Sequence, residues 1–174
     1  METKRNQLFY KIISTSMSPS LNVGDIVIKG KKAPKEIKTG EDGDILILEG
    51  PQYFYENGID PIMWNNLPED FPIIHRAINK MKKGDLWYFQ TKGDNNWAPD
   101  GSLIIKEKTK KGFIAEFNPN KSIYIPESKV LGVVIKRIPY NGNEKLLQKS
   151  SDFFFNIKLF ERMEVKVFFK NQGQ

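Results

Sequence analysis

Short runs of alternating apolar and polar residues dominate the first 140 positions of the chain. Seven of these runs are rich in Ile, Val, Phe and Tyr and are bounded by Gly, Asp, Asn or Pro, which is typical of strands joined by turns. The pattern therefore predicts a mainly β fold. We expect strands at residues 9–14, 25–29, 44–49, 73–80, 86–90, 112–117 and 130–138.

Two internal segments depart from the β pattern. Residues 17–22 can start a short helix, with Ser18 as its cap and Pro19 in the first turn. Residues 51–71 contain three prolines and form a long insertion between predicted strands. Aromatic residues in this insertion predict that it packs against the rest of the fold.

The C-terminal segment, residues 145–170, combines many Phe residues with regularly spaced charges. Two interpretations stay open for it. It forms a final strand pair or helix that closes the core, which we favour, or it lies in the interface of a membrane.

Composition narrows the classes of function. The 174 residues are 39% hydrophobic and 28% charged, which suits one domain with a hydrophobic core. The chain has no cysteine and one histidine, so it excludes disulfides, thiolate metal sites and histidine-rich metal sites. We expect no cofactor and no metal. No apolar run reaches the roughly 18–20 residues of a membrane span.

The formal charge of +6 raises the question of an anionic partner. The basic residues are spread along the chain, with local clusters only at 29–38 and 106–111. Solvated lysine faces are sufficient to explain them, and no nucleic-acid partner is expected.

One serine and the single histidine are candidates for nucleophilic catalysis. A serine hydroxyl needs a base that takes its proton, and histidine titrates near neutral pH. Ser16 ends a β run directly before Met17 and a proline-containing turn, a place that suits a nucleophile with free backbone N–H groups. The alternatives are that His75 is a core residue and that Ser16 is a solvent-facing turn serine.

The segment Ser-Thr-Ser-Met-Ser-Pro-Ser-Leu at 14–21, followed by Gly24-Asp25, closely resembles the nucleophile box of type I signal peptidases. Four further blocks of the chain also resemble that family. His75-Arg76, in the second of these blocks, resembles the archaeal and endoplasmic-reticulum branch, because bacterial members have a lysine base there. Together the blocks cover about residues 9–142. The four blocks, in the family's order, are 43–47, 74–78, 91–96 with Asp100 following, and 130–142.

The resemblance implies a role for each matching residue. Ser16 is the nucleophile, His75 is the general base, and Asp100 is the acid that completes the triad. Asp94 is a second acid in the same block, and we favour Asp100 over it as the triad acid. The hydroxyl of Ser14 and the N–H of Ser16 would hold the oxyanion. Lys92 is interpreted as structural.

The resemblance also implies a fold and an activity. The expected fold is a folded antiparallel sheet domain at 9–142, between a polar segment at 1–8 and a Phe-rich extension at 143–174. The expected activity is serine endopeptidase cleavage of signal peptides from secretory precursors after small residues, in an Ala-x-Ala-like pattern. The substrate would be held as an added β-strand. The residues expected to line its groove are Ile13, Thr15, Ile73 and Ile74.

Several positions differ from the family's pattern. Thr15 replaces the usual glycine between the two serines, and the alignment of Asp100 rests on spacing. Polar residues 1–7 stand where the family has its membrane anchor. If an anchor has been removed, we expect a membrane-associated protein with an extracytoplasmic catalytic domain that contacts the membrane surface; otherwise we expect a soluble protein. The oligomeric state is left open.

Three alternatives compete with this interpretation. Self-cleaving repressor peptidases share the fold but use a lysine base, which His75-Arg76 and residues 91–96 argue against. An inactive binding domain would keep the fold without using the triad, and the intact set of three residues argues against that. A nucleic-acid-binding β-barrel would need interleaved basic and aromatic residues on one face, which the sequence does not convincingly offer.

Overall fold

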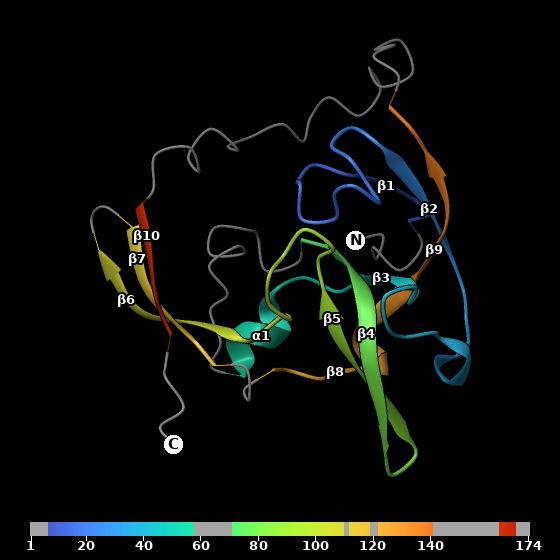
Figure 1. The fold of residues 1–174 in the computed structure, drawn as a ribbon. Helices are drawn as coiled ribbons and strands as arrows, with labels where there is room; N and C mark the ends of the chain where they lie inside the picture. Colours follow the sequence, from blue (N-terminus) through green and yellow to red (C-terminus); the bar gives the residue numbers. More distant parts are fainter. Residues whose placement is uncertain (1–6, 58–70, 110–111, 119–121, 141–163, 170–174) are drawn as a thin grey trace.

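The computed structural model describes residues 7–57, 71–109, 112–118, 122–140 and 164–169. Seven strands form one antiparallel sheet in the order β1-β2-β9-β3-β4-β5-β8, and this sheet curls into a half-barrel (Figure 1). The strands are β1 (Phe9–Lys11), β2 (Ile26–Gly30), β3 (Ile45–Leu48), β4 (Ile73–Lys83), β5 (Leu86–Lys92), β8 (Ile125–Pro126) and β9 (Val130–Ile138).

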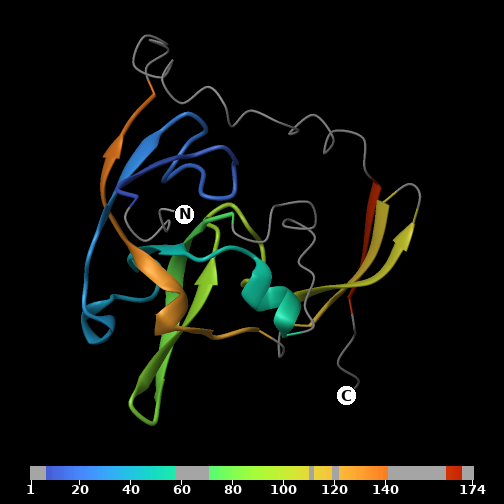
Figure 2. The same cartoon turned by 180° about the vertical axis from the view of Figure 1, so that it is seen from behind.

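A second sheet of three strands lies to one side of the first (Figure 2). It consists of β6 (Leu103–Thr109), β7 (Gly112–Phe117) and β10 (Glu164–Phe169). Strands β6 and β7 form an antiparallel hairpin, and β10 pairs with β7 in parallel. The described helical segments are short: α1 (Gln52–Glu56) and the 3-10 turns η2 (Pro34–Glu36) and η4 (Glu127–Lys129).

The mainly β prediction is confirmed, and each of the seven predicted strands has an observed counterpart. The strands predicted at 112–117 and 130–138 have the observed bounds, and the other five differ at one or both ends. Strands β6, β8 and β10 were not among the predicted strands. Strand β6 has three apolar residues followed by four charged or polar ones, and β8 has only two residues, so neither gives a clear alternating signal. Strand β10 gives the C-terminal extension one strand, and residues 141–163 lie outside the described part.

The segment after Ser16 differs from the prediction of a short helix. Residues 16–20 form turns, and the bond from Leu21 N–H to Met17 O, 2.8 Å long, has helical spacing. The next N–H, that of Asn22, donates instead to the side chain of Asp25 at 2.8 Å. The helical bonding therefore does not continue past Leu21.

The insertion at 51–71 begins as helix α1, whose Phe54 is only 1% exposed. The predicted packing of this insertion against the fold is therefore confirmed at its start. Residues 58–70, with Met63 and Trp64, lie outside the described part of the chain.

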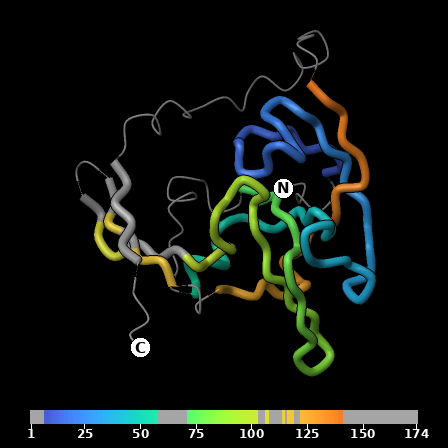
Figure 3. Tube along the Cα trace, in the orientation of Figure 1, coloured from blue at the N-terminus to red at the C-terminus, as the bar shows by residue number. Residues whose placement is uncertain are grey.

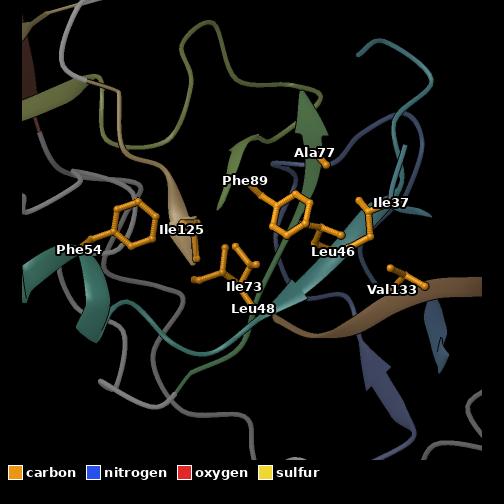
Figure 4. Packing of buried hydrophobic residues seen from close by; sticks show 9 residues of the cluster. All are labelled: Ile37, Leu46, Leu48, Phe54, Ile73, Ala77, Phe89, Ile125 and Val133. Carbon is orange, nitrogen blue, oxygen red and sulfur yellow. The ribbon is translucent and has the colours of Figure 1, made fainter. Parts of the chain in front are cut away.

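Strand β3 separates two hydrophobic clusters. Successive side chains of a strand point to opposite faces, so Leu46 and Leu48 lie in one cluster and Ile47 in the other. All three are at most 1% exposed, and full burial of such a side chain contributes roughly 1.5–3 kcal/mol. The first cluster (Figure 4) comprises Ile37, Leu46, Leu48, Phe54, Ile73, Ala77, Phe89, Ile125 and Val133.

The second cluster fixes the loop that contains Ser16. Met17 and Leu21, both 2% exposed, pack there with Tyr10, Ile12 and Val27. The burial of these two side chains holds the loop in place. It leaves Ser16 half-buried at the boundary between this cluster and solvent.

Candidate active site

The loop from residue 12 to residue 25 is closed at its base by backbone hydrogen bonds. Ile12 N–H donates to Asp25 O and Gly24 N–H donates to Ile12 O, each at 2.8 Å. Met17 is buried in the second cluster, whereas the side chain of Ser16 reaches His75 near the start of β4. In Figure 3 this blue loop lies beside the start of the green β4.

His75 lies on β4 with alternate neighbours buried, and it is only 2% exposed. Its Nε2 is 3.1 Å from Ser16 Oγ, and its Nδ1 is 2.7 Å from Asp100 Oδ2. A carboxylate can only accept, so Nδ1 carries the proton and Nε2 is left to accept the hydroxyl proton of Ser16. The structure therefore joins Ser16, His75 and Asp100 in one hydrogen-bonded chain, with the connectivity that Ser-His-Asp enzymes use.

Asp94 lies in a different set of contacts. The guanidinium of Arg76 donates to it twice, from Nε at 2.7 Å and from Nη2 at 2.6 Å. Burial raises the pKa of the Asp94 carboxyl, but the hydrogen bonds from Arg76 and Ser20 and the charges of Arg76 and Lys92 outweigh it, so the pKa is lowered overall. Of the two predicted acids, the structure brings Asp100 and not Asp94 to His75.

The backbone of Ser16 is held by the segment that follows β5. Asn95 N–H donates to Ser16 O at 2.8 Å. Gly93 approaches the same carbonyl so closely that a Cβ at this position would lie 2.6 Å from Ser16 O. The Gly-Asp-Asn-Asn block is thus packed directly against the backbone of the candidate nucleophile.

The predicted oxyanion residues lie side by side. Ser14 Oγ is 3.2 Å from Ser16 Oγ, and Ser14 is exposed. A hydroxyl beside the nucleophile can donate to an oxygen that becomes negatively charged there. Thr15, between them, is exposed as well, so its extra side chain meets solvent rather than the core.

Ser20 is held from two sides by arginines, a feature that the sequence analysis missed. Arg76 Nη2 donates to Ser20 Oγ and Arg137 Nη1 donates to Ser20 O, both at 3.1 Å. Arg137 is in turn 2.6 Å from the buried carboxylate of Asp25. Because Ser20 belongs to the Ser16 loop, both arginines restrain that loop.

Asp25 holds Arg137, the second of the two arginines, in place. It is 2% exposed and accepts the N–H groups of Asn22 and Tyr140, at 2.8 and 2.9 Å. Burial raises the pKa of the Asp25 carboxyl, but these N–H donors and the guanidinium of Arg137 outweigh it and lower the pKa overall. In the sequence, Asp25 is marked only by the Gly24-Asp25 pair after the nucleophile box. A buried carboxylate needs hydrogen-bond donors such as these.

Of the four residues expected to line the substrate groove, Ile73 and Ile74 lie on β4, and Ile13 and Thr15 lie in the loop after β1. Ile13 and Ile74 are half-buried and Thr15 is exposed, whereas Ile73 is 4% exposed and contributes its side chain to the first cluster. Strand β4 pairs with β3 from Ile73 onward but with β5 only from Arg76 onward. In the described part of the chain, residues 73–75 therefore have a strand neighbour on one side only.

Lys92 donates its ammonium group to Asn96 O at 2.9 Å, within the loop that follows β5. Within the described ranges, no group of three or more His, Cys, Asp and Glu side chains is arranged to bind a metal ion. No helix in those ranges is long and apolar enough to span a membrane.

Three known proteins similar to this chain have the same name. The signal peptidase complex catalytic subunit of Fusarium vanettenii is 26% identical over 137 residues, which is 78% of this chain and 67% of the relative. That of Pyricularia oryzae is 28% identical over 118 residues, 67% of this chain and 58% of the relative. That of Sclerotinia sclerotiorum is 28% identical over 137 residues, with 78% and 67% covered.

The matched part thus spans about three fifths to two thirds of the length of these relatives. No protein-family model matches the chain. The matches nevertheless cover most of the chain and agree on one kind of protein. The chain is therefore a sequence relative of the catalytic subunits of the signal peptidase complex, which confirms its resemblance to the endoplasmic-reticulum branch of the type I signal peptidases.

Proposed function

We propose that this chain is a serine endopeptidase that cleaves signal peptides from secretory precursors after small residues, with Ser16 as nucleophile. The single observation that supports it most is the continuous hydrogen-bonded chain from Ser16 through His75 to Asp100. The relatives are named as catalytic subunits of the signal peptidase complex, which supports the substrate class. The preference for Ala-x-Ala-like sites rests on the family resemblance.

The first step is attack by Ser16 Oγ on the carbonyl carbon of the scissile peptide bond. His75 Nε2, 3.1 Å away, takes the hydroxyl proton as the C–O bond forms. The imidazolium that results is stabilised by Asp100, whose Oδ2 lies 2.7 Å from Nδ1. Both His75 and Asp100 are buried, so the site excludes water around this ion pair and strengthens it.

The second step breaks the peptide bond. The oxyanion is held by the hydroxyl of Ser14 and the N–H of Ser16, whose backbone is fixed through the bond from Asn95 to Ser16 O. His75 returns its proton to the leaving amine, and an acyl group stays on Ser16 Oγ. Water then attacks this ester, with His75 as base again, and releases the new carboxylate.

The substrate is held as an added β-strand. Two unpaired strand edges next to the site support this. Strand β1 is an edge strand of the main sheet. Residues 73–75 of β4 pair with β3 on one side, and β4 pairs with β5 on the other side only from Arg76 onward. An extended peptide between them would pair its main chain with these edges and bring its scissile carbonyl to Ser16. Ile13, Thr15 and Ile74 would lie along that peptide, and Ile73 would contribute backbone.

The site of action is the surface of a membrane, where signal peptides are presented. The relatives are named as subunits of a complex, and we extend that to this chain as part of the proposal. Exposed apolar side chains on or next to β1 and on β9, among them Leu8, Phe9 and Ile135, support contact with a membrane or a neighbouring subunit.

The proposal is tested by cleavage of a fluorogenic peptide with an Ala-x-Ala site, in mild detergent. We expect Ser16→Ala and His75→Ala to abolish cleavage, because the first removes the nucleophile and the second removes the base that takes its proton. Ser128→Ala is the matched control, because Ser128 is exposed on η4. Equal cleavage by the wild type and Ser16→Ala would overturn the assigned site.

A further inference from the structure

Thr91 contacts the candidate triad through Asp100, on the side away from Ser16. It lies on β5, is fully buried at 0% exposure, and its Oγ1 donates to Asp100 Oδ2 at 2.6 Å. This is the same carboxylate oxygen that lies 2.7 Å from His75 Nδ1. One carboxylate oxygen therefore receives two donors, one from the candidate base and one from Thr91.

The main chain of Thr91 holds Asp100 as well. Asp100 N–H donates to Thr91 O at 2.8 Å. Thr91 thus fixes both the backbone and the side chain of Asp100. A carboxylate with a single partner could turn about its Cβ–Cγ bond, and a second fixed donor on the same oxygen removes most of that freedom.

The sheet sets the position of Thr91 relative to His75. Thr91 pairs with Ala77 across β4 and β5, and residues two apart on a strand point to the same face. His75, Ala77 and Thr91 therefore share one face of the sheet, and Asp100 lies between His75 and Thr91. The distance between base and donor is fixed by strand pairing, which is more rigid than a loop.

A structural role alone would not need a hydroxyl at this place. Valine has the same shape as threonine and is favoured in buried strands. A buried threonine hydroxyl needs a partner, and here the partner is a carboxylate, which makes short and strong charge-assisted bonds.

We propose that Thr91 is a positioning residue of the peptidase reaction, acting through Asp100 to hold His75 in the orientation and tautomer that accept the proton of Ser16. The inference rests on the proposed function and deepens it. Thr91 itself touches neither substrate nor nucleophile in this scheme. Its effect must therefore disappear when Asp100 is absent.

The test compares Thr91→Val, Thr91→Ala and Thr91→Ser in peptide cleavage. We expect both variants without the hydroxyl to lower kcat about tenfold to hundredfold, with KM changed less than about twofold, since a hydrogen bond to a charged group is lost while the substrate groove is kept. Thr91→Ser keeps the donor and should stay within about threefold of the wild type. Thr91→Ala covers the case in which the valine methyl disturbs folding beside the carboxylate.

A double-mutant cycle separates positioning from general damage. In an Asp100→Ala background, Thr91→Val should cause less than a twofold further loss. An equal loss with and without Asp100, or full activity of both hydroxyl-free variants, would overturn the inference. Ser16→Ala is measured alongside: if it still cleaves, the proposed function itself fails, whereas an inactive Ser16→Ala with fully active Thr91→Val refutes only the role of Thr91.

Discussion

At the scale of single residues, the aspartate of the Gly-Asp-Asn-Asn block and the aspartate that follows it have separate tasks. Asp100 is 6% exposed and faces His75, whereas Asp94 forms a two-bonded ion pair with Arg76. Arg76 also donates to Gly43 O at 2.7 Å and to Ser20, so Asp94 orients a side chain that ties three segments together. Asp100 therefore holds the candidate base, and Asp94 holds an arginine that connects the segments around it.

Asp25 and Asp94 make stability sensitive to acid. Burial raises both pKa values, but the hydrogen bonds and cations around each carboxyl lower them overall, below the ordinary value of about 3.9. A lowered pKa means that these carboxylates stabilise the fold above that ordinary value, and that the stabilisation is lost as pH falls through the lowered values. We expect a melting temperature that changes little from about pH 7 to pH 5 and decreases below about pH 4.

The control for acid sensitivity is Asp25→Asn, which removes the charge that Arg137 pairs with. This variant should melt lower than the wild type near neutral pH and should show a shallower decrease in acid. A wild-type melting temperature that rises as the pH falls from 4 to 2.5 would contradict the assignment of lowered pKa values to these groups.

At the scale of elements, β5 and the loop after it organise the site. Within ten residues they supply Thr91, the close approach of Gly93, the bond from Asn95 to Ser16 O, and Asp100. The loop with Ser16 is attached to this segment on one side and to the second cluster on the other. A displacement of the β5 loop must therefore move the candidate nucleophile relative to its base.

Gly93→Ala tests that coupling. The new Cβ would lie 2.6 Å from Ser16 O, so either the loop or the Ser16 backbone must shift. We expect at least a tenfold loss of kcat/KM in peptide cleavage, with a destabilisation of about 1–3 kcal/mol in denaturant unfolding, as is usual for overpacking.

The matched control is Gly84→Ala in the β4–β5 hairpin. A Cβ there meets nothing within 4 Å, and the positive φ of 61° costs about 1 kcal/mol for alanine. This variant should lose a little stability and no activity. Wild-type cleavage by Gly93→Ala would refute the coupling between the loop and Ser16.

At the scale of the whole molecule, the local pattern of the sequence predicts most strands, and the order of its motifs predicts the residues of the candidate site. Alternation located six of the seven strands of the main sheet and strand β7 of the second sheet. The order of the blocks selected Ser16, His75 and Asp100, which the structure brings together. Their catalytic roles stay predictions, as do the domain boundaries at 9–142 and the groove residues.

Long-range pairing was beyond the reach of pattern analysis. The contacts of Asp25 with Arg137 and Tyr140 join the loop after β1 to the end of β9, and nothing local in either segment indicates the other. The choice of β7 as partner for β10 is of the same kind. The short helix predicted after Ser16 did not form. The N–H of Asn22 donates to the side chain of Asp25, three residues on, and such local side-chain to backbone bonds compete with helix formation.

The central claim is that His75 activates Ser16, and covalent trapping tests it without knowledge of the natural substrate. The protein is treated with a serine-directed acylating inhibitor near pH 8, and the modified residue is identified by mass spectrometry of its peptides. The account predicts one adduct, on Ser16, that is lost in Ser16→Ala and forms at least a hundredfold more slowly in His75→Ala. An adduct that forms equally fast without His75, or no adduct on Ser16 in the folded wild type, would contradict it and favour a domain that binds without cleaving.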